Sequence, residues 1–174
     1  MATLEHDLDV PQPSEIGEVL DPKGEKRVQI EKEIVSLKEI CWTLTNSQHR
    51  NLNKFPGAHP VSLTREYLEH TLKPEADKYV VCEKTDGVRY LLLLLSRGTY
   101  LVDRKYVFTK VKVVFPLPAG EKVGNKWLHH KTLLDGELVV DKLPHSGEKR
   151  LRYLVYDILS DNWKSLLDLN FAER

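Results

Sequence analysis

Hydrophobic positions follow a helical period in one early segment of the chain. Between Lys26 and about Leu44 the apolar residues recur at alternating steps of four and three, which is the spacing of one helix face. These residues are Ile30, Ile34, Leu37, Cys41 and Leu44. We therefore predict a helix here whose apolar face packs against a core, and a docking surface for a partner is the alternative for that face.

The segments on either side of this helix lack such a period. Residues 1–25 combine prolines, glycines and acidic residues, which is typical of a flexible leader. After a polar loop, the segment Phe55–Ser62 contains two prolines and a glycine that favour an irregular, extended path. Ser62 is a candidate N-cap for a short helix that ends before Pro74.

From Lys78 onward short β-rich runs alternate with turn signals. The runs are Tyr79–Glu83, Arg89–Leu95, Tyr100–Asp103, Tyr106–Val114, Glu137–Asp141 and Leu151–Leu159. With the earlier helices, they predict an α+β fold with an antiparallel-rich sheet. We expect an acidic leader at 1–25, a helical N-terminal part at 26–77 and the sheet domain at 78–174.

Composition and charge narrow the class of protein. The chain of 174 residues is 41% hydrophobic and 30% charged, as in globular domains, and its longest apolar run is too short to cross a bilayer. The acidic N-terminus also lacks the pattern of a signal peptide, so we expect an intracellular protein without membrane partners. Two cysteines are too few for a disulfide framework and fit a reducing compartment. Seven acidic residues against one basic residue give residues 1–25 a charge of −6, which leaves +6 on the rest of this neutral chain. A basic body suits a polyanionic substrate, and ordinary surface charge is the alternative.

The stretch Val80–Arg89 holds the best candidate for a reactive group. If it begins as a strand, Val80, Cys82 and Lys84 share one face, and Lys84 ends that apolar row. A lysine at the lip of a partly desolvated pocket has a lowered pKa, and Arg89 beyond the turn would lower it further. The alternative is an ordinary hairpin whose Asp86-Gly87 turn is flanked by solvated cations.

Four motifs in order give this stretch its context. Lys84-Thr85-Asp86-Gly87 with Arg89 resembles the Lys-x-Asp-Gly-x-Arg nucleophile motif of covalent nucleotidyltransferases, the superfamily of mRNA capping guanylyltransferases and polynucleotide ligases. Three later segments resemble further motifs of that superfamily: Tyr100–Arg104, Leu133–Val139 and Arg152–Leu159. The segment Phe55–Ser62 is similar to one that precedes the nucleophile in mRNA guanylyltransferases, and it selects the capping branch.

The resemblance implies a two-step transfer of GMP. Lys84 would attack GTP and carry GMP as a phosphoramidate, which then passes to the 5′-diphosphate end of RNA with Mg²⁺ or Mn²⁺ as cofactor. It also assigns roles to further residues: Glu83, Arg89, Arg104, Asp135, Gly136, Glu137 and Tyr156 for substrate binding, and Glu137 and Asp157 for the metal. From the residues alone, a core tyrosine is the favoured interpretation of Tyr156, and a strand-end cap is the alternative for Asp157.

The later motifs of the family and its oligonucleotide-binding barrel are not found in these residues. We therefore expect a nucleotidyltransferase domain that is incomplete at its C-terminus and impaired when alone. Two alternatives are a non-catalytic module of the capping complex and a fragment of an ATP-dependent polynucleotide ligase. The expected partners are an RNA triphosphatase and the phosphorylated tail of RNA polymerase II, in the nucleus.

The remaining side chains with possible chemistry have ordinary structural interpretations. His129 and His130 are neighbours that cannot share one strand face, which makes a metal role improbable. The three tryptophans, Trp42, Trp127 and Trp163, are interpreted as packing residues.

Overall fold

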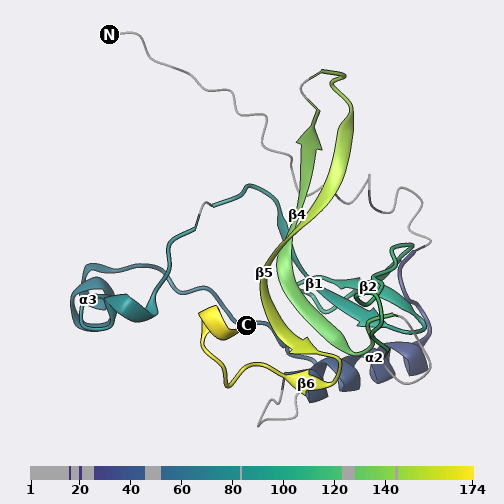
Figure 1. Cartoon of the computed structure of the whole chain (residues 1–174), viewed down its shortest axis with the longest axis horizontal. Coiled ribbons are helices and arrows are strands. Elements are labelled where there is room, and N and C mark those ends of the chain that lie inside the picture. The colour runs from purple at the N-terminus through teal and green to yellow at the C-terminus, as the bar shows by residue number, and fades with distance from the viewer. Residues whose placement is uncertain are drawn as a thin grey trace.

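A single antiparallel sheet forms the centre of the protein. The computed structural model describes residues 16, 20, 26–45, 52–82, 84–122, 128–143 and 145–174. Within them six strands pair in the order β3-β2-β1-β4-β5-β6 (Figure 1). The strands are β1 (Val88–Leu95), β2 (Gly98–Val102), β3 (Phe108–Val111), β4 (Thr132–Lys142), β5 (Lys149–Asp161) and β6 (Lys164–Ser165). The fold is thus α+β with an antiparallel sheet, as the sequence predicts.

The middle of the sheet is buried on both faces. Leu91–Leu95 of β1 are all buried, because each face of the strand is covered by its own group of apolar side chains. The hairpin of β4 and β5 is longer than predicted at both strands and projects beyond the rest of the sheet (Figure 1). β3 is shorter than predicted and β6 was not predicted.

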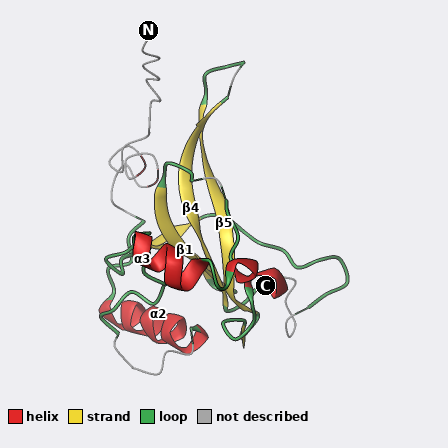
Figure 2. Cartoon of the chain, turned by 90° about the vertical axis from the view of Figure 1, so that its left-hand side faces the viewer, coloured by secondary structure: helices red, strands yellow, loops and turns green. Residues whose placement is uncertain are grey.

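Helix α2 (Glu31–Leu44) covers one face of the sheet (Figure 2). Leu37, Cys41 and Leu44 are buried in the core on that face, as predicted. The predicted start at Lys26 is wrong, because the backbone of residues 26–28 pairs with β3 through Val28 N to Phe108 O and Lys110 N to Lys26 O. Ile30 consequently lies just outside the helix and is exposed.

The opposite face is covered in part by residues that the sequence assigns to a flexible leader. Ile16 and Leu20 are helical and buried beside Leu92, Leu94 and Leu101. The expectation of a flexible leader is therefore wrong for these two residues. Their spacing of four places both side chains on one helix face. The other residues of 1–25 lie outside the described residues.

A short helical segment stands apart from the sheet (Figure 1). It consists of α3 (Arg65–Tyr67), the π-helix η1 (Leu68–Leu72) and the 3-10 helix η2 (Ala76–Lys78). The cap is Thr64 and not Ser62, because the Thr64 hydroxyl accepts a hydrogen bond from Tyr67 N. Leu63 and Leu68 are exposed, so this segment adds little to the core.

The predicted strand Tyr79–Glu83 does not form. Tyr79, Val80 and Val81 are exposed, and the structure pairs none of the described residues 79–82 with the sheet. The Asp86-Gly87 turn does not fold the preceding chain back onto β1, because Glu137 of β4 accepts hydrogen bonds from Gly87 N and the Thr85 hydroxyl and holds this segment as a loop. The apolar row that was to end at Lys84 is therefore absent from the structure, and Glu83 lies outside the described residues.

The chain closes with the 3-10 helix η3 (Phe171–Glu173), which Asn170 and Glu173 cap reciprocally. In the portions of the chain that the structure describes, no helix has the length and apolar character that spanning a membrane requires.

Candidate functional site

Pairing of β1 with β4 brings three of the predicted residues onto one face of the sheet. Arg89 lies opposite Glu137 in the register, and Leu91 lies opposite Asp135. Because residues directly opposite each other in an antiparallel pair share a face, Arg89, Asp135 and Glu137 lie on the face that α2 covers farther along. The apolar core of that face thus ends in a polar cluster.

Arg89 and Asp135 form a paired, largely buried contact in this cluster. Nε donates to Oδ1 over 2.8 Å and Nη2 donates to Oδ2, with the Arg89 and Asp135 side chains 15% and 9% exposed. The hydrogen bond to Asp135 raises the pKa of Arg89, so the guanidinium stays charged. This two-point geometry fixes the orientation of both groups.

The same arginine holds the segment that follows Phe55. Nη1 donates to Ala58 O over 2.6 Å, and the guanidinium lies 5.8 Å from the centre of the Phe55 ring. Gly57 lies so near that an added Cβ would be 2.4 Å from the Phe55 ring and 3.2 Å from Arg89 Nη2. The segment 55–58 is therefore packed against the site through Arg89.

Glu137 anchors the loop of residues 84–87 to the sheet. Its Oε1 accepts from Gly87 N over 3.2 Å, and its Oε2 accepts from the hydroxyls of Thr85 and Tyr156. Burial, followed by the hydrogen bond to Glu137, raises the pKa of Tyr156 to about 12. The phenol is thus a protonated donor at neutral pH.

A β-bulge places Tyr156 in the cluster. Asp135 pairs with Asp157 while Gly136 pairs with Val155, so Tyr156 is the extra residue on β5. Gly136 permits this close approach, because an added Cβ would lie 2.3 Å from Leu154 O. The Tyr156 side chain remains 40% exposed and so presents part of its ring to solvent.

Lys84 lies on the loop in a setting unlike the predicted one. Its side chain is 84% exposed, and Nζ contacts Asp86 Oδ1 at 2.5 Å. The hydrogen bond to Asp86 raises the pKa of Lys84, so the expectation of a lowered pKa at the lip of an apolar pocket is wrong for this structure. Arg89 does not produce the expected lowering, since Asp135 compensates its charge.

Two other predicted residues lie apart from the cluster. Arg104 is exposed in the turn between β2 and β3, and Asp103 Oδ1 holds this turn by accepting from Lys105 N and Val107 N. Asp157 pairs with Arg174 at 3.1 Å and accepts from Ile158 N. Asp157 and Glu137 therefore make separate contacts.

The carboxylates do not form a metal centre in this arrangement. Asp86, Asp135, Glu137 and Asp157 each bind a different partner, and the described part of the chain holds no cluster of three or more His, Cys, Asp or Glu residues suited to a metal ion. These residues do not fit a metal held by the protein alone, and the predicted roles of Glu137 and Asp157 toward it stay predictions.

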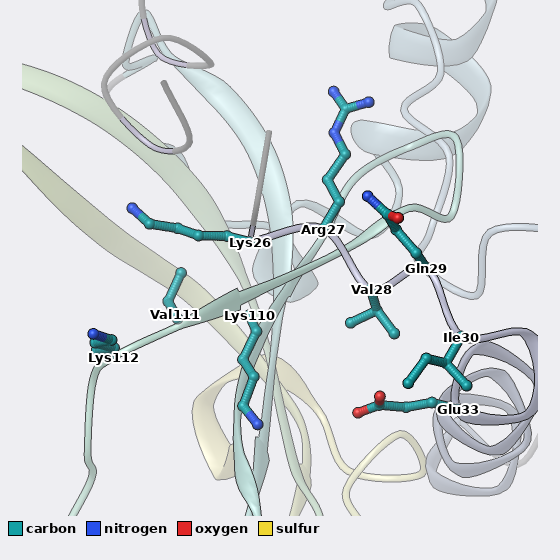
Figure 3. Close-up of a pocket in the computed structure, with 9 residues that line it drawn as sticks. All are labelled: Lys26, Arg27, Val28, Gln29, Ile30, Glu33, Lys110, Val111 and Lys112. Atoms are coloured by element: carbon teal, nitrogen blue, oxygen red, sulfur yellow. The ribbon is translucent and has the colours of Figure 1, made fainter. Parts of the chain in front are cut away.

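A separate cavity of about 640 Å³ lies at the other edge of the sheet (Figure 3). Lys110 and Glu33 project toward the space between β3 and α2, whereas Arg27 points away. Tyr100 donates to Glu33 over 3.0 Å and lies under Lys110, 5.8 Å from its Nζ. Since none of the predicted site residues lines this cavity, it is distinct from the candidate site.

Sequence reasoning passed over two parts of the site. Thr85 lies inside the nucleophile motif, yet only the structure shows its contact with Glu137, which is 52 residues away. The Ala58 carbonyl likewise gives no sequence signal, because a backbone acceptor is the same in every residue.

Comparison with known proteins places this arrangement in a family context. Residues 20–174 match the family described as mRNA capping enzyme, catalytic domain. The chain is 44% identical over 113 residues to mRNA-capping enzyme subunit alpha of Schizosaccharomyces pombe, covering 61% of this chain and 27% of that protein. It is 37% identical over 139 residues to the protein of the same name from Saccharomyces cerevisiae, covering 75% and 30%, respectively.

A vertebrate protein is similar over a longer part of the chain. The mRNA-capping enzyme of Danio rerio is 30% identical over 154 residues, covering 87% of this chain and 24% of that protein. The chain thus spans less than a third of the length of these relatives.

Proposed function

The chain belongs to the family of mRNA capping enzyme catalytic domains, and from this premise we propose that it acts as an mRNA guanylyltransferase with Lys84 as the GMP acceptor. One observation carries the proposal. The Lys84 amine is exposed on a loop that Glu137 ties to the sheet, and Glu137 lies opposite Arg89 of the fixed Arg89–Asp135 pair. An accessible nucleophile on an anchored loop is what in-line attack on a bound phosphate needs.

The first half-reaction is a substitution at the α-phosphorus of GTP. Lys84 Nζ forms a P–N bond, the bond from the α-phosphorus to the bridging oxygen breaks, and pyrophosphate leaves with the electron pair. The amine must lose a proton for this attack, and Asp86 Oδ1 is a proton acceptor within hydrogen-bond distance of Nζ. The raised pKa of Lys84 opposes the loss of this proton, so nucleotide binding has to loosen the ion pair between Lys84 and Asp86.

Other members of the cluster orient the nucleotide in this proposal. Tyr156 offers a partly exposed ring for stacking on guanine, and Glu137 offers acceptors for ribose hydroxyls once Thr85 turns away. Arg89 binds the ribose or α-phosphate region, Asp135 and Gly136 shape the site wall, and Glu83 precedes the nucleophile. Arg104, which lies apart from the cluster, is proposed to reach the same region from the exposed turn between β2 and β3. Because Arg89 is already paired, its first contribution is to fix the wall of the site.

In the second half-reaction GMP passes from Lys84 to the 5′-diphosphate end of RNA. We propose that the sheet is the first part of a nucleotidyltransferase domain whose later motifs lie outside these 174 residues, supported by the small share of each relative that the chain spans. An RNA triphosphatase and the phosphorylated tail of RNA polymerase II are the proposed partners, in the nucleus. The subunit names of the fungal relatives support an assembly of this kind. Mg²⁺ or Mn²⁺ is proposed to accompany GTP.

The proposal is tested by offering α-labelled GTP or ATP to the purified chain with Mg²⁺ or Mn²⁺, alone and with the remainder of a relative's catalytic domain. Denaturing electrophoresis should show label from GTP on the 20.1 kDa chain, absent from Lys84→Ala. Label from ATP alone would favour the polynucleotide ligase alternative. Label surviving on Lys84→Ala, or no label in either mixture, would contradict the assignment.

A further inference from the structure

The turn between β5 and β6 holds a tryptophan in an unfavourable backbone conformation. Asp161 pairs with Lys164, so Asn162 and Trp163 form a two-residue loop, with φ of 44° and 78°. Two-residue hairpins with positive φ at both positions favour Asn followed by Gly, because side chains with a Cβ are strained there. A bulky aromatic residue at the glycine position is therefore unexpected on conformational grounds, and such strain is a reason to look for function.

Trp163 is not the packing residue that the sequence suggests. Its side chain is 53% exposed at the end of the sheet where β5 turns into β6 (Figure 1). Lys131 Nζ lies 2.9 Å from the ring centre, and the His130 ring meets it edge-on at 6.2 Å. The Trp163 backbone N donates to Lys131 O over 3.2 Å, and Lys131 itself has a φ of 56°. The ring is thus held in place by neighbours and still open to solvent.

Positive charge collects around this ring. Arg97 lies close enough to lower the pKa of Lys131, after the larger effect of burial. The nearby carboxylate of Asp161 is engaged by His129 at 3.3 Å and by the Thr132 hydroxyl at 3.1 Å. Two neighbouring cations raise the local potential and favour an anionic ligand.

A cavity of about 240 Å³ lies at the β1–β2 turn and includes His129, which contacts Asp161 and Asn162 beside Trp163. Its lining includes Arg97, Ser96 and His129, together with apolar side chains such as Val113 and Phe115. Ser96 N donates to His130 Nδ1 over 3.0 Å, and His129 Nδ1 lies 3.5 Å from Asn162 Nδ2. The cavity and the exposed ring are therefore joined through the two histidines.

We propose that Trp163, with Lys131 over its ring and Arg97 in the adjoining cavity, is a stacking site for a base of single-stranded RNA. An exposed aromatic ring among cations is the general arrangement that binds single strands, since the ring meets the base and the cations meet the backbone. In β4, Thr132 lies near this turn and Glu137 lies in the candidate site, five residues or roughly 17 Å apart. RNA with its 5′ end at Lys84 would reach Trp163 a few nucleotides downstream, so this inference rests on the proposed function.

The test measures binding of a fluorescein-labelled single-stranded RNA by polarisation, without GTP. Trp163→Gly installs the favoured turn residue, so we expect a midpoint of thermal unfolding equal to or above that of the unmodified chain. Its RNA affinity should fall between about fivefold and a hundredfold, the range for loss of one stacked base. Trp163→Phe should keep most of the affinity, because it keeps a stacking ring.

Charge variants provide a matched comparison. Lys131→Gln should make the plot of log affinity against log salt concentration less steep, by about one unit of slope, because one phosphate contact is lost. Lys73→Gln removes the same charge from an exposed position on the separate helical segment and should leave the slope unchanged. An unmodified chain that does not bind RNA, a Trp163→Gly variant with unchanged affinity, or a loss that Trp163→Phe shares in full would overturn the inference.

GMP labelling of the same variants separates this inference from the proposed function. Trp163→Gly should label as the unmodified chain does, since it lies outside the nucleotide cluster. If labelling fails in every variant while Trp163→Gly still lowers RNA affinity, the proposed function fails and the RNA site stands. If labelling is normal while RNA affinity is unchanged, the proposed function stands and the RNA site fails.

Discussion

Lys84 on its loop and Arg89 on β1 are five residues apart in the sequence, and the structure holds the two side chains in different ways. Arg89 is paired at two points with Asp135 inside the sheet, whereas the Lys84 side chain is 84% exposed and contacts its own loop at Asp86. Glu137 joins the two regions through Gly87 N. The sheet thus fixes the walls of the site, while the nucleophile depends on few contacts and remains free to meet a substrate.

The largest expected difference between the sheet and the loop region is in the reactivity of the two cysteines. Cys41 is buried on the face of α2 that packs against the sheet, and Cys82 is exposed just before the loop. Burial raises the pKa of Cys41 to about 12, so on the order of one thiol in ten thousand is ionised at pH 8. Alkylation followed by mass spectrometry at pH 8 should modify Cys82 and leave Cys41 intact.

The pH dependence of this protection follows from the direction of the shift. The Cys41 thiolate becomes abundant only as pH approaches the raised pKa, so moving from pH 7 to pH 9 should not expose Cys41 to the reagent. Denaturant should make both thiols react. Equal rates in the folded chain would mean that α2 does not cover this face of the sheet.

Removing the Asp135 carboxylate should destabilise the sheet at the Arg89–Asp135 pair. In Asp135→Ala, Arg89 loses its partner while still largely buried, and leaving a buried charge uncompensated costs about 3 kcal/mol in free energy of unfolding. Urea denaturation is the measurement. The paired replacement Arg89→Leu with Asp135→Leu should recover much of the loss, because it removes both charges together.

Arg89→Ala alone should also lower the free energy of unfolding, by leaving Asp135 unpaired. A fully stable Asp135→Ala or Arg89→Ala variant would show that the pair is not a structural element of the site. In that case the arginine would be free for substrate, as the motif alone suggests.

Changing Lys84 should have the smallest effect on stability. Lys84→Ala removes a solvent-exposed side chain, and such substitutions away from packing usually change stability little. Differential scanning fluorimetry should give the same midpoint as for the unmodified chain. A clear drop would mean that the contact between Lys84 and Asp86 supports the fold.

The sheet was the most predictable part of the fold. The leucine run of β1 and the aromatic and branched residues of β2 and β5 identify strands because burial on a sheet leaves a direct pattern. The helix start was missed because Ile30 fits the spacing of the stripe, although the backbone just before it pairs with β3 and the helix begins only at Glu31. Ile16 and Leu20 were missed because two apolar residues among many acids form no visible period.

The candidate site was predictable in part of its membership and not in its contacts, since Arg104 and Asp157 lie apart from the cluster. Register places Arg89 opposite Glu137, and the sequence identified both. Two features depend on tertiary geometry that residue spacing does not encode: the bulge at Tyr156 and the Thr85 contact. The raised pKa of Lys84 is a local effect of Asp86, two residues away, and depends on how the loop folds. The exposed apolar residues Val80 and Val81 resembled a strand because their type suits one, while the contacts of Thr85 and Gly87 with Glu137 hold the following segment as a loop.

The proposed function depends above all on the attachment of GMP to Lys84. Tandem mass spectrometry can locate this attachment after the chain is incubated with GTP and Mg²⁺ or Mn²⁺, together with the remainder of a relative's catalytic domain where the chain alone takes no label. We expect the mass of GMP on the peptide that contains Lys84, with fragments locating it to that lysine. GMP on any other residue, or the same modification in Lys84→Ala, would contradict the proposed function.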